Sequence, residues 1–176
     1  MSGHNKWSKI KDKKAITDVK KSRVFGKIAK LIASESRRAK GDTSSPSLRA
    51  AIAKAKELNM PSDNIDRAVK KGLGEEAALM EEVVYEAYGP GGAAIVILGL
   101  TDSKNRSSAE IKHLLSEHEA SLSASGSAMW AFEKTEGSLK PKTTVSISEE
   151  DGKKLSLLVE ELENHDDVQE VYTNAI

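Results

Sequence analysis

The spacing of apolar residues changes once along this chain, near residues 72–79. Before that segment they recur with the period of an α-helix, about 3.6 residues, as at Val24, Ile28, Leu31 and Ile32. After it they alternate with the two-residue period of a β-strand, as at Val83, Tyr85 and Ala87. We therefore predict two domains, residues 1–78 and residues 79–176, with a linker within Gly72–Leu79.

The first domain is predicted to be a small helical bundle, because its apolar stripes are interrupted by Gly, Pro and capping residues. The first helix should run from Thr17 or Asp18 to about Lys40, with Gly41 just beyond its end. The two others should cover about Ser47–Asn59 and Ser62–Gly72. Short helices of this kind must pack together to bury their apolar faces.

The second domain is predicted to be α+β, with the order ββαββαβ and helices on one face of a largely antiparallel sheet. Gly89–Gly92 reads as a tight hairpin turn between the first two strands, and phosphate contact by this turn is the weaker alternative. The remaining expected elements are a helix over Asn105–His118, a strand through Ala128, Trp130 and Phe132, a strand over Thr143–Ile147, a helix capped at Ser148, and a strand over Val168–Tyr172.

Charge is strongly segregated although the formal net charge is zero. Residues 1–74 hold 19 Lys and Arg against 7 Asp and Glu, and residues 75–176 hold 8 against 20. The first forty residues alone carry thirteen cations against three carboxylates. Such a segment repels itself unless a polyanion offsets its charge, and a nucleic-acid backbone is the commonest such partner. A solvated N-terminal arm, or an acidic half that shields the basic half, would also fit.

The candidate nucleic-acid-binding residues are the cations near the N-terminus together with one tryptophan: Lys6, Trp7, Lys9, Lys11, Lys13, Lys14, Lys20, Lys21, Arg23 and Lys27. Lysines act as point charges on phosphates, so we expect weak sequence specificity or recognition of RNA shape. Trp7 could stack on a base, or it could anchor the N-terminal segment onto the bundle.

Several other functions are disfavoured. The chain has no Cys, which excludes disulfides and thiolate chemistry, and its four His lack metal-ligand spacing. No apolar run or secretory signal suggests a membrane partner, so we expect a cytoplasmic protein. No nucleophile or carboxylate motif indicates an enzyme, a cofactor or a small-molecule substrate.

Several blocks of the sequence resemble the YebC/PmpR family. They are Gly3–Lys11, Met60-Pro61 with Ile65 and Arg67-Ala68, Tyr85-Glu86, Tyr88–Gly92, Asn105-Arg106, Gly126-Ser127 with Phe132, and Asp166–Asn174. Members of that family usually carry an additional α/β domain between the equivalents of Phe132 and Val145. This chain has little more than residues 133–144 there, so we expect the inserted domain to be missing.

The resemblance implies a DNA-binding transcriptional regulator, or else a ribosome-associated translation factor that binds structured RNA. The family description favours the first role, whereas a patch rich in Lys and poor in Arg favours the second. A third hypothesis is an interaction protein whose acidic half binds a basic partner.

Overall fold

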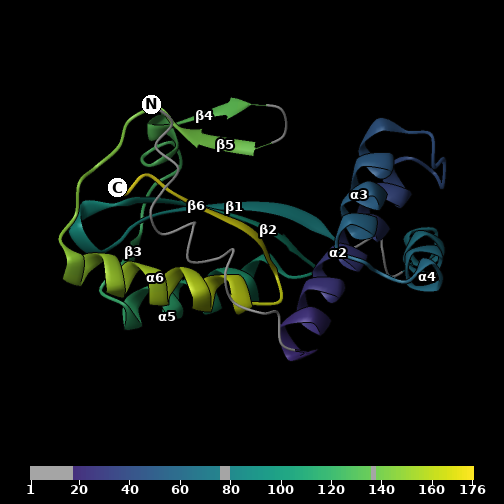
Figure 1. Ribbon diagram of the computed structural model, residues 1–176, viewed down its shortest axis with the longest axis horizontal. Helices are drawn as coiled ribbons and strands as arrows, with labels where there is room; N and C mark the ends of the chain where they lie inside the picture. Colours follow the sequence, from purple (N-terminus) through teal and green to yellow (C-terminus); the bar gives the residue numbers. More distant parts are fainter. Residues whose placement is uncertain (1–17, 76–79, 136–137) are drawn as a thin grey trace. The chain divides into compact units, whose positions relative to one another are not determined.

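The computed structural model describes residues 18–75, 80–135 and 138–176. These residues divide into two compact units, shown in Figure 1. The helical unit holds the described residues up to Glu82 together with Leu100–Ser103, and the sheet unit holds Val83–Gly99 and Lys104–Ile176. The α+β fold class is confirmed. The predicted boundary between residues 78 and 79 lies outside the described residues.

The helical unit contains α2 (Asp18–Arg38), α3 (Pro46–Glu57) and α4 (Ser62–Gly72). Its core is formed by apolar stripes from all three helices: Ile28, Ile32, Leu48, Ala51, Ala55, Met60, Ile65 and Ala68. Gly41 follows α2 with a φ of 81° and donates its N–H to the carbonyl oxygen of Ser36 at 2.8 Å. That left-handed residue satisfies a terminal carbonyl, as expected for a glycine just beyond a helix.

Helices α2 and α4 approach closely at Gly72. A Cβ at this position would lie 2.3 Å from the carbonyl oxygen of Ala33 and 2.7 Å from the Cβ of Ser36. The hydroxyl of Ser36 donates to the carbonyl oxygen of Val69 at 2.8 Å in the same contact. The end of α4 therefore packs backbone against backbone on α2.

We expect Gly72→Ala to lower the free energy of unfolding by about 1–3 kcal/mol, because the added methyl group must push two helices apart. Gly26→Ala is the matched control, since it also adds a methyl group to a helix but meets no atom within 4 Å. The control should raise stability by about 0.5–1 kcal/mol through helix propensity. Urea unfolding of both variants checks this pair, and equal effects would contradict the packing account.

The sheet unit is built on four strands in the order β3-β1-β2-β6. Their bounds are Glu81–Tyr88 for β1, Ala94–Thr101 for β2, Ser121–Leu122 for β3 and Val168–Thr173 for β6. Strands β3 and β6 pair antiparallel with β1 and β2, respectively. Every second residue of β2 points to the same face, so Ile95 and Ile97 join one core and Ala94 and Val96 another.

Helices α5 (Lys104–Glu117) and α6 (Glu149–Asn164) cover one face of this sheet (Figure 1). They contribute Ile111, Leu115, Leu155, Leu158 and Leu162 to the core that holds Ile95 and Ile97. The side chain of Ser148 accepts a hydrogen bond from the backbone N–H of Asp151, so the predicted cap of α6 is confirmed. The placement of both helices on one face was also predicted correctly.

Two predicted strands are wrong. Residues Met129–Ala131 form a short 3-10 helix, η3, and the strand β4 begins only at Phe132 (Phe132–Thr135). Residues 143–147 contribute an isolated parallel bridge between Val145 and Ala175, and the strand β5 lies earlier, at Ser138–Pro141. Strands β4 and β5 pair with each other in a separate two-stranded sheet, and the short β3 was not predicted. The predicted order ββαββαβ is therefore wrong in its middle part.

The turn that joins β1 and β2 has the predicted hairpin geometry. Gly91 has φ 69° and ψ 10°, and Gly92 donates its N–H to the carbonyl oxygen of Gly89 at 3.1 Å. These are the features of a type II turn with Pro90 and Gly91 at its centre. A Cβ on Gly91 would lie 2.5 Å from Cγ2 of Ile147. Packing therefore accounts for this glycine without a phosphate contact.

Candidate nucleic-acid interface

The structure describes four of the ten predicted binding residues, and all four lie in the N-terminal part of α2. Lys21 and Arg23 are exposed, whereas Lys20 and Lys27 are half-buried. The ammonium of Lys21 lies 5.6 Å from the centre of the Phe25 ring, within the range of a cation–π contact. The other six, Lys6, Trp7, Lys9, Lys11, Lys13 and Lys14, lie outside the described residues. The beginning of α2 is thus a cationic helical surface.

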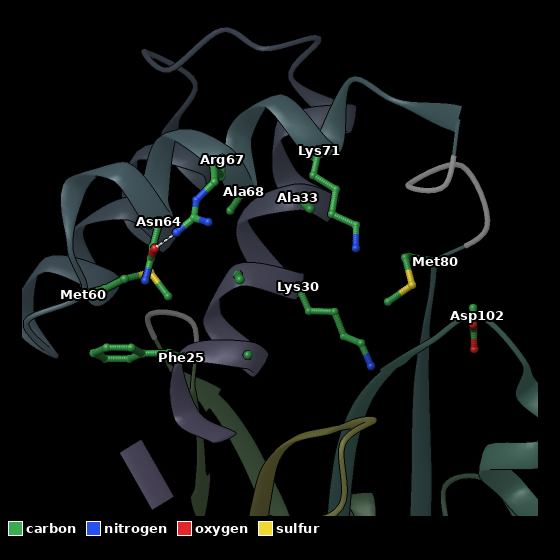
Figure 2. Close-up of a pocket in the computed structure, with 12 residues that line it drawn as sticks. Phe25, Lys30, Ala33, Met60, Asn64, Arg67, Ala68, Lys71, Met80 and Asp102 are labelled. Carbon is green, nitrogen blue, oxygen red and sulfur yellow. Dashed lines mark hydrogen bonds between the residues drawn. The ribbon is translucent and has the colours of Figure 1, made fainter. Parts of the chain in front are cut away.

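A groove of about 760 Å³ opens between α2 and α4 within the helical unit (Figure 2). Its floor is mainly apolar and includes Phe25, Ala29, Ala33, Met60 and Ala68. Among the described residues that line it, three are cationic, namely Lys30, Arg67 and Lys71, and one, Asp102, is acidic. The groove thus combines the aromatic ring of Phe25 and the thioethers of Met60 and Met80 with three positive charges.

Both helices position the charges of this groove. Figure 2 shows Arg67 and Lys71 extending from α4 and Lys30 extending from α2. The guanidinium of Arg67 donates from Nε to the carbonyl oxygen of Asp63 at 3.3 Å and also donates to the side-chain oxygen of Asn64. These contacts hold Arg67 against its own helix at the edge of the groove.

Sequence reasoning did not place Lys30, Arg67 or Lys71 among the candidate binding residues. Arg67 and Lys71 are separated by four positions, which places them on one face of a helix, and this signal could have identified them. Their proximity to Lys30 depends on how α4 packs on α2 and has no signature in the sequence.

Glu86 is buried, and its carboxylate accepts hydrogen bonds from backbone N–H groups. Its side chain accepts N–H bonds from Gly126 at 2.6 Å, Ala128 at 2.8 Å and Met129 at 2.7 Å, and the residue is only 6% exposed. Burial tends to raise the pKa of this carboxyl, but the three hydrogen bonds outweigh burial, and the pKa lies below its ordinary value. Glu86 therefore fixes the loop before η3, and its carboxylate is engaged in structure.

The described residues also contain one cluster whose ligand atoms are close enough to hold a metal ion: Glu110, His165 and Asp167. His165 accepts the N–H of Asp167 at Nδ1, at 3.1 Å, and its Nε2 lies 2.9 Å from the carboxylate of Glu110. Arg106 donates to the buried carboxylate of Asp167 at 2.9 Å. The guanidinium of Arg106 thus already supplies a positive charge to these carboxylates. The spacing of the histidines along the sequence gives no sign of this cluster, because Glu110 lies in α5 whereas His165 and Asp167 lie in the segment before β6.

Within the described part of the chain, the helices are too short or too polar to span a lipid bilayer.

Comparison with known proteins places the chain among TACO1/YebC proteins. A family model described as the TACO1/YebC protein N-terminal domain matches residues 5–75. The model of the TACO1/YebC second and third domain matches residues 80–137 and 133–175.

Curated relatives and a solved structure agree with these matches. A protein from Fervidobacterium nodosum named "Probable transcriptional regulatory protein" is 37% identical, with 99% of this chain and 93% of the relative covered. A protein from Thermoanaerobacter pseudethanolicus with the same descriptive name is also 37% identical, over 99% of this chain and 96% of its own length. The crystal structure of a conserved hypothetical protein from Aquifex aeolicus matches with a TM-score of 0.81 and 30% identity, covering 90% of this chain and 91% of that one.

The same comparisons confirm the expected deletion. The alignment with the Fervidobacterium relative spans 235 positions, 59 more than the 176 residues of this chain. The second family model is matched in two pieces that meet at residues 133–137. The chain has the β4–β5 hairpin at this point, in place of the inserted domain.

Proposed function

Because the chain belongs to the TACO1/YebC family, we propose that it is a non-enzymatic, nucleic-acid-binding protein that regulates transcription. The curated relatives are named as probable transcriptional regulatory proteins. The observation that carries the binding step is the gathering of cations on the helical unit, along the start of α2 and around the groove between α2 and α4. Neutralising phosphates with such cations releases condensed counterions, which drives association.

A second candidate is a ribosome-associated translation factor that binds structured RNA. The composition of the α2 surface favours it, since Lys20, Lys21 and Lys27 outnumber the single Arg23. Lysines position a protein on a phosphate backbone but do not form the bidentate contacts with guanine that arginines make in a DNA major groove. Both candidates use the same cationic surface and place the protein in the cytoplasm.

The absence of enzymatic activity is supported by the engagement of the polar groups most suited to catalysis. Glu86 accepts three backbone hydrogen bonds, and His165 uses both ring nitrogens in contacts with Asp167 and Glu110. A general acid or base must reach a substrate proton, and both of these groups are already engaged in hydrogen bonds within the fold.

Crosslinking in cells, followed by sequencing of the attached nucleic acid, tests this proposal. Recovery of chromosomal DNA from promoter regions is the result expected for the transcriptional role. Recovery of ribosomal RNA would replace it with the translational role. Recovery of neither above the level of an uncrosslinked sample would contradict nucleic-acid binding altogether.

A further inference from the structure

We propose that the groove between α2 and α4 holds an unstacked base of a single-stranded nucleic acid. Phe25 and Met60 would contact the base, and Lys30, Arg67 and Lys71 would contact the flanking phosphates. This inference rests on the proposed nucleic-acid binding and specifies the form of the ligand that the helical unit takes.

The floor of the groove suits a flat, largely apolar ring. Phe25 is half-buried, so part of its ring packs into the helical core while the rest lines the groove with Ala29 and Met60. The volume of about 760 Å³ lies within the range of small-ligand pockets, about 300–1,000 Å³. Every base has a π-face, so stacking on an aromatic side chain is favourable for all sequences.

The charged residues of the groove indicate where the backbone of the strand lies and where its base lies. Arg67 and Lys71 are one helical turn apart on α4, so they can contact successive phosphates of a strand that runs along this helix. Asp102 lies beside Met80, at the end of the groove away from Phe25 and Met60 (Figure 2). Its carboxylate disfavours a phosphate at that end. The aromatic ring of Phe25 and the thioether of Met60 lie at the opposite end, so we place the base there.

A duplex would leave the floor of this groove unused. The faces of paired bases are stacked on one another inside a duplex, and only phosphates and groove edges reach the surface. An unpaired base can turn out of its stack and reach Phe25. Three cations around an apolar floor could also accept an acidic peptide with an apolar side chain, and the experiment below separates that outcome.

The test measures binding of the full-length protein to a fluorescein-labelled oligouridylate of about ten nucleotides, with a duplex of the same length as the second probe. Phe25→Leu keeps an apolar side chain but removes the aromatic face. It should weaken binding to the single strand by about ten-fold and leave binding to the duplex within about two-fold. Thermal melting checks that this variant folds.

Two neighbouring lysines provide a matched pair that does not touch the core. Lys71 lines the groove, whereas Lys70 lines a second depression with Asp63, Asp66 and Arg67, so that Arg67 borders both. Both lie in the last turn of α4. Lys71→Gln should weaken oligouridylate binding by about five-fold at 0.1 M salt, because losing one phosphate contact on a single strand is expected to lower the affinity by that factor. Lys70→Gln should change it by less than about two-fold.

Photocrosslinking with 4-thiouridine in the same oligonucleotide locates the base. Attachment to peptides that contain Phe25 or Met60 is expected. If the protein binds the oligonucleotide but crosslinks elsewhere, and the groove variants bind normally, the groove inference is wrong while the proposed function stands. If the protein binds neither probe even at low salt, the proposed function fails as well. Binding of an acidic, phenylalanine-containing peptide that is abolished in the Lys71→Gln variant, without oligonucleotide binding, would assign the groove to a protein partner.

Discussion

Raising the salt concentration from about 50 mM to about 200 mM should weaken nucleic-acid binding by about a thousand-fold to a hundred-thousand-fold. The size of this effect follows from the cations on the helical half, thirteen of which lie in the first forty residues. We assume that about six to ten of these cations bind phosphates. In a plot of the logarithm of affinity against the logarithm of salt concentration, each phosphate contact then adds about −0.9 to the slope for duplex DNA and about −0.7 for a single strand. Fluorescence anisotropy titrations at several salt concentrations give this slope directly.

Thermal melting over the same range of salt is the control, because the protein must remain folded for the slope to report on binding. An affinity that stays constant between the two salt concentrations would show that phosphate contacts do not drive the association. In that case the cations of α2 and of the groove would have another role.

Replacing Glu86 should lower the stability of the sheet unit strongly, although the residue is polar. Its carboxylate accepts three backbone N–H groups, from Gly126, Ala128 and Met129. Glu86→Ala leaves these donors without their acceptor, at about 1–3 kcal/mol each, so the loss should be about 4 kcal/mol or more. Glu86→Gln keeps one carbonyl oxygen but directs an amide at an N–H donor, and should cost about 2–3 kcal/mol. Urea unfolding measures both values.

The exposed residue Glu133 provides the control for Glu86. Glu133→Gln removes the same charge from β4 and should change the free energy of unfolding by less than about 0.5 kcal/mol. Equal effects of the Glu86 and Glu133 substitutions would show that net charge, and not the backbone contacts, determines the result.

The pH dependence of the Glu86→Gln effect provides an independent check. The pKa of Glu86 is lowered in the folded protein from an ordinary value of 4.5, so its contribution is complete above that value. The contribution disappears as pH falls through the lower pKa of the folded state, because the carboxylate then takes up a proton. The stability difference between the wild-type protein and Glu86→Gln should therefore be constant above about pH 5 and shrink below about pH 4. A difference that grows on acidification would contradict this assignment.

The helices of the basic half could be predicted because local signals delimit them. Pro46 and Pro61 lie at helix starts, and Gly41 follows the end of α2 with a positive φ, where backbone geometry favours these residues. Gly72 is the last residue of α4, and the close approach of α2 leaves no room for a side chain there. The apolar stripes between these positions have a single helical period. The structure places the helices within a few residues of the prediction because no distant contact competes with these local preferences.

The middle of the acidic half could not be predicted in the same way. Ala128, Trp130 and Phe132 alternate as a strand would, yet the N–H groups of Ala128 and Met129 bond to Glu86, more than forty positions away. That contact bends the chain into η3 before β4 begins. Residues 143–147 likewise bond in part to the C-terminal segment, where Val145 donates to Asn174 at 3.0 Å. Long-range hydrogen bonds therefore override the local alternation in both places.

The proposed binding surface could be predicted only in part from the sequence, for a related reason. The density of charge near the N-terminus is a local property, and it indicated Lys20, Lys21, Arg23 and Lys27. The groove brings Lys30 of α2 together with Arg67 and Lys71 of α4, nearly forty positions further along the chain. Only the packing of α4 on α2 creates that combination of charges.

Charge reversal on α2, compared with charge reversal on the β4–β5 hairpin, tests the central claim most directly. Lys21 and Arg23 are exposed near the start of α2, where glutamates also suit the helix dipole. Lys140 and Lys142 are exposed at the end of the hairpin and carry the same charge in the sheet unit. The Lys21→Glu/Arg23→Glu variant should bind duplex DNA about thirty-fold more weakly than the wild-type protein at 0.15 M salt, the share of two phosphate contacts. The Lys140→Glu/Lys142→Glu variant should weaken binding by less than about three-fold, because these two lysines belong to the sheet unit, to which we assign no contact with DNA. Equal weakening in the two variants, or none in the α2 variant, would contradict binding through the helical unit.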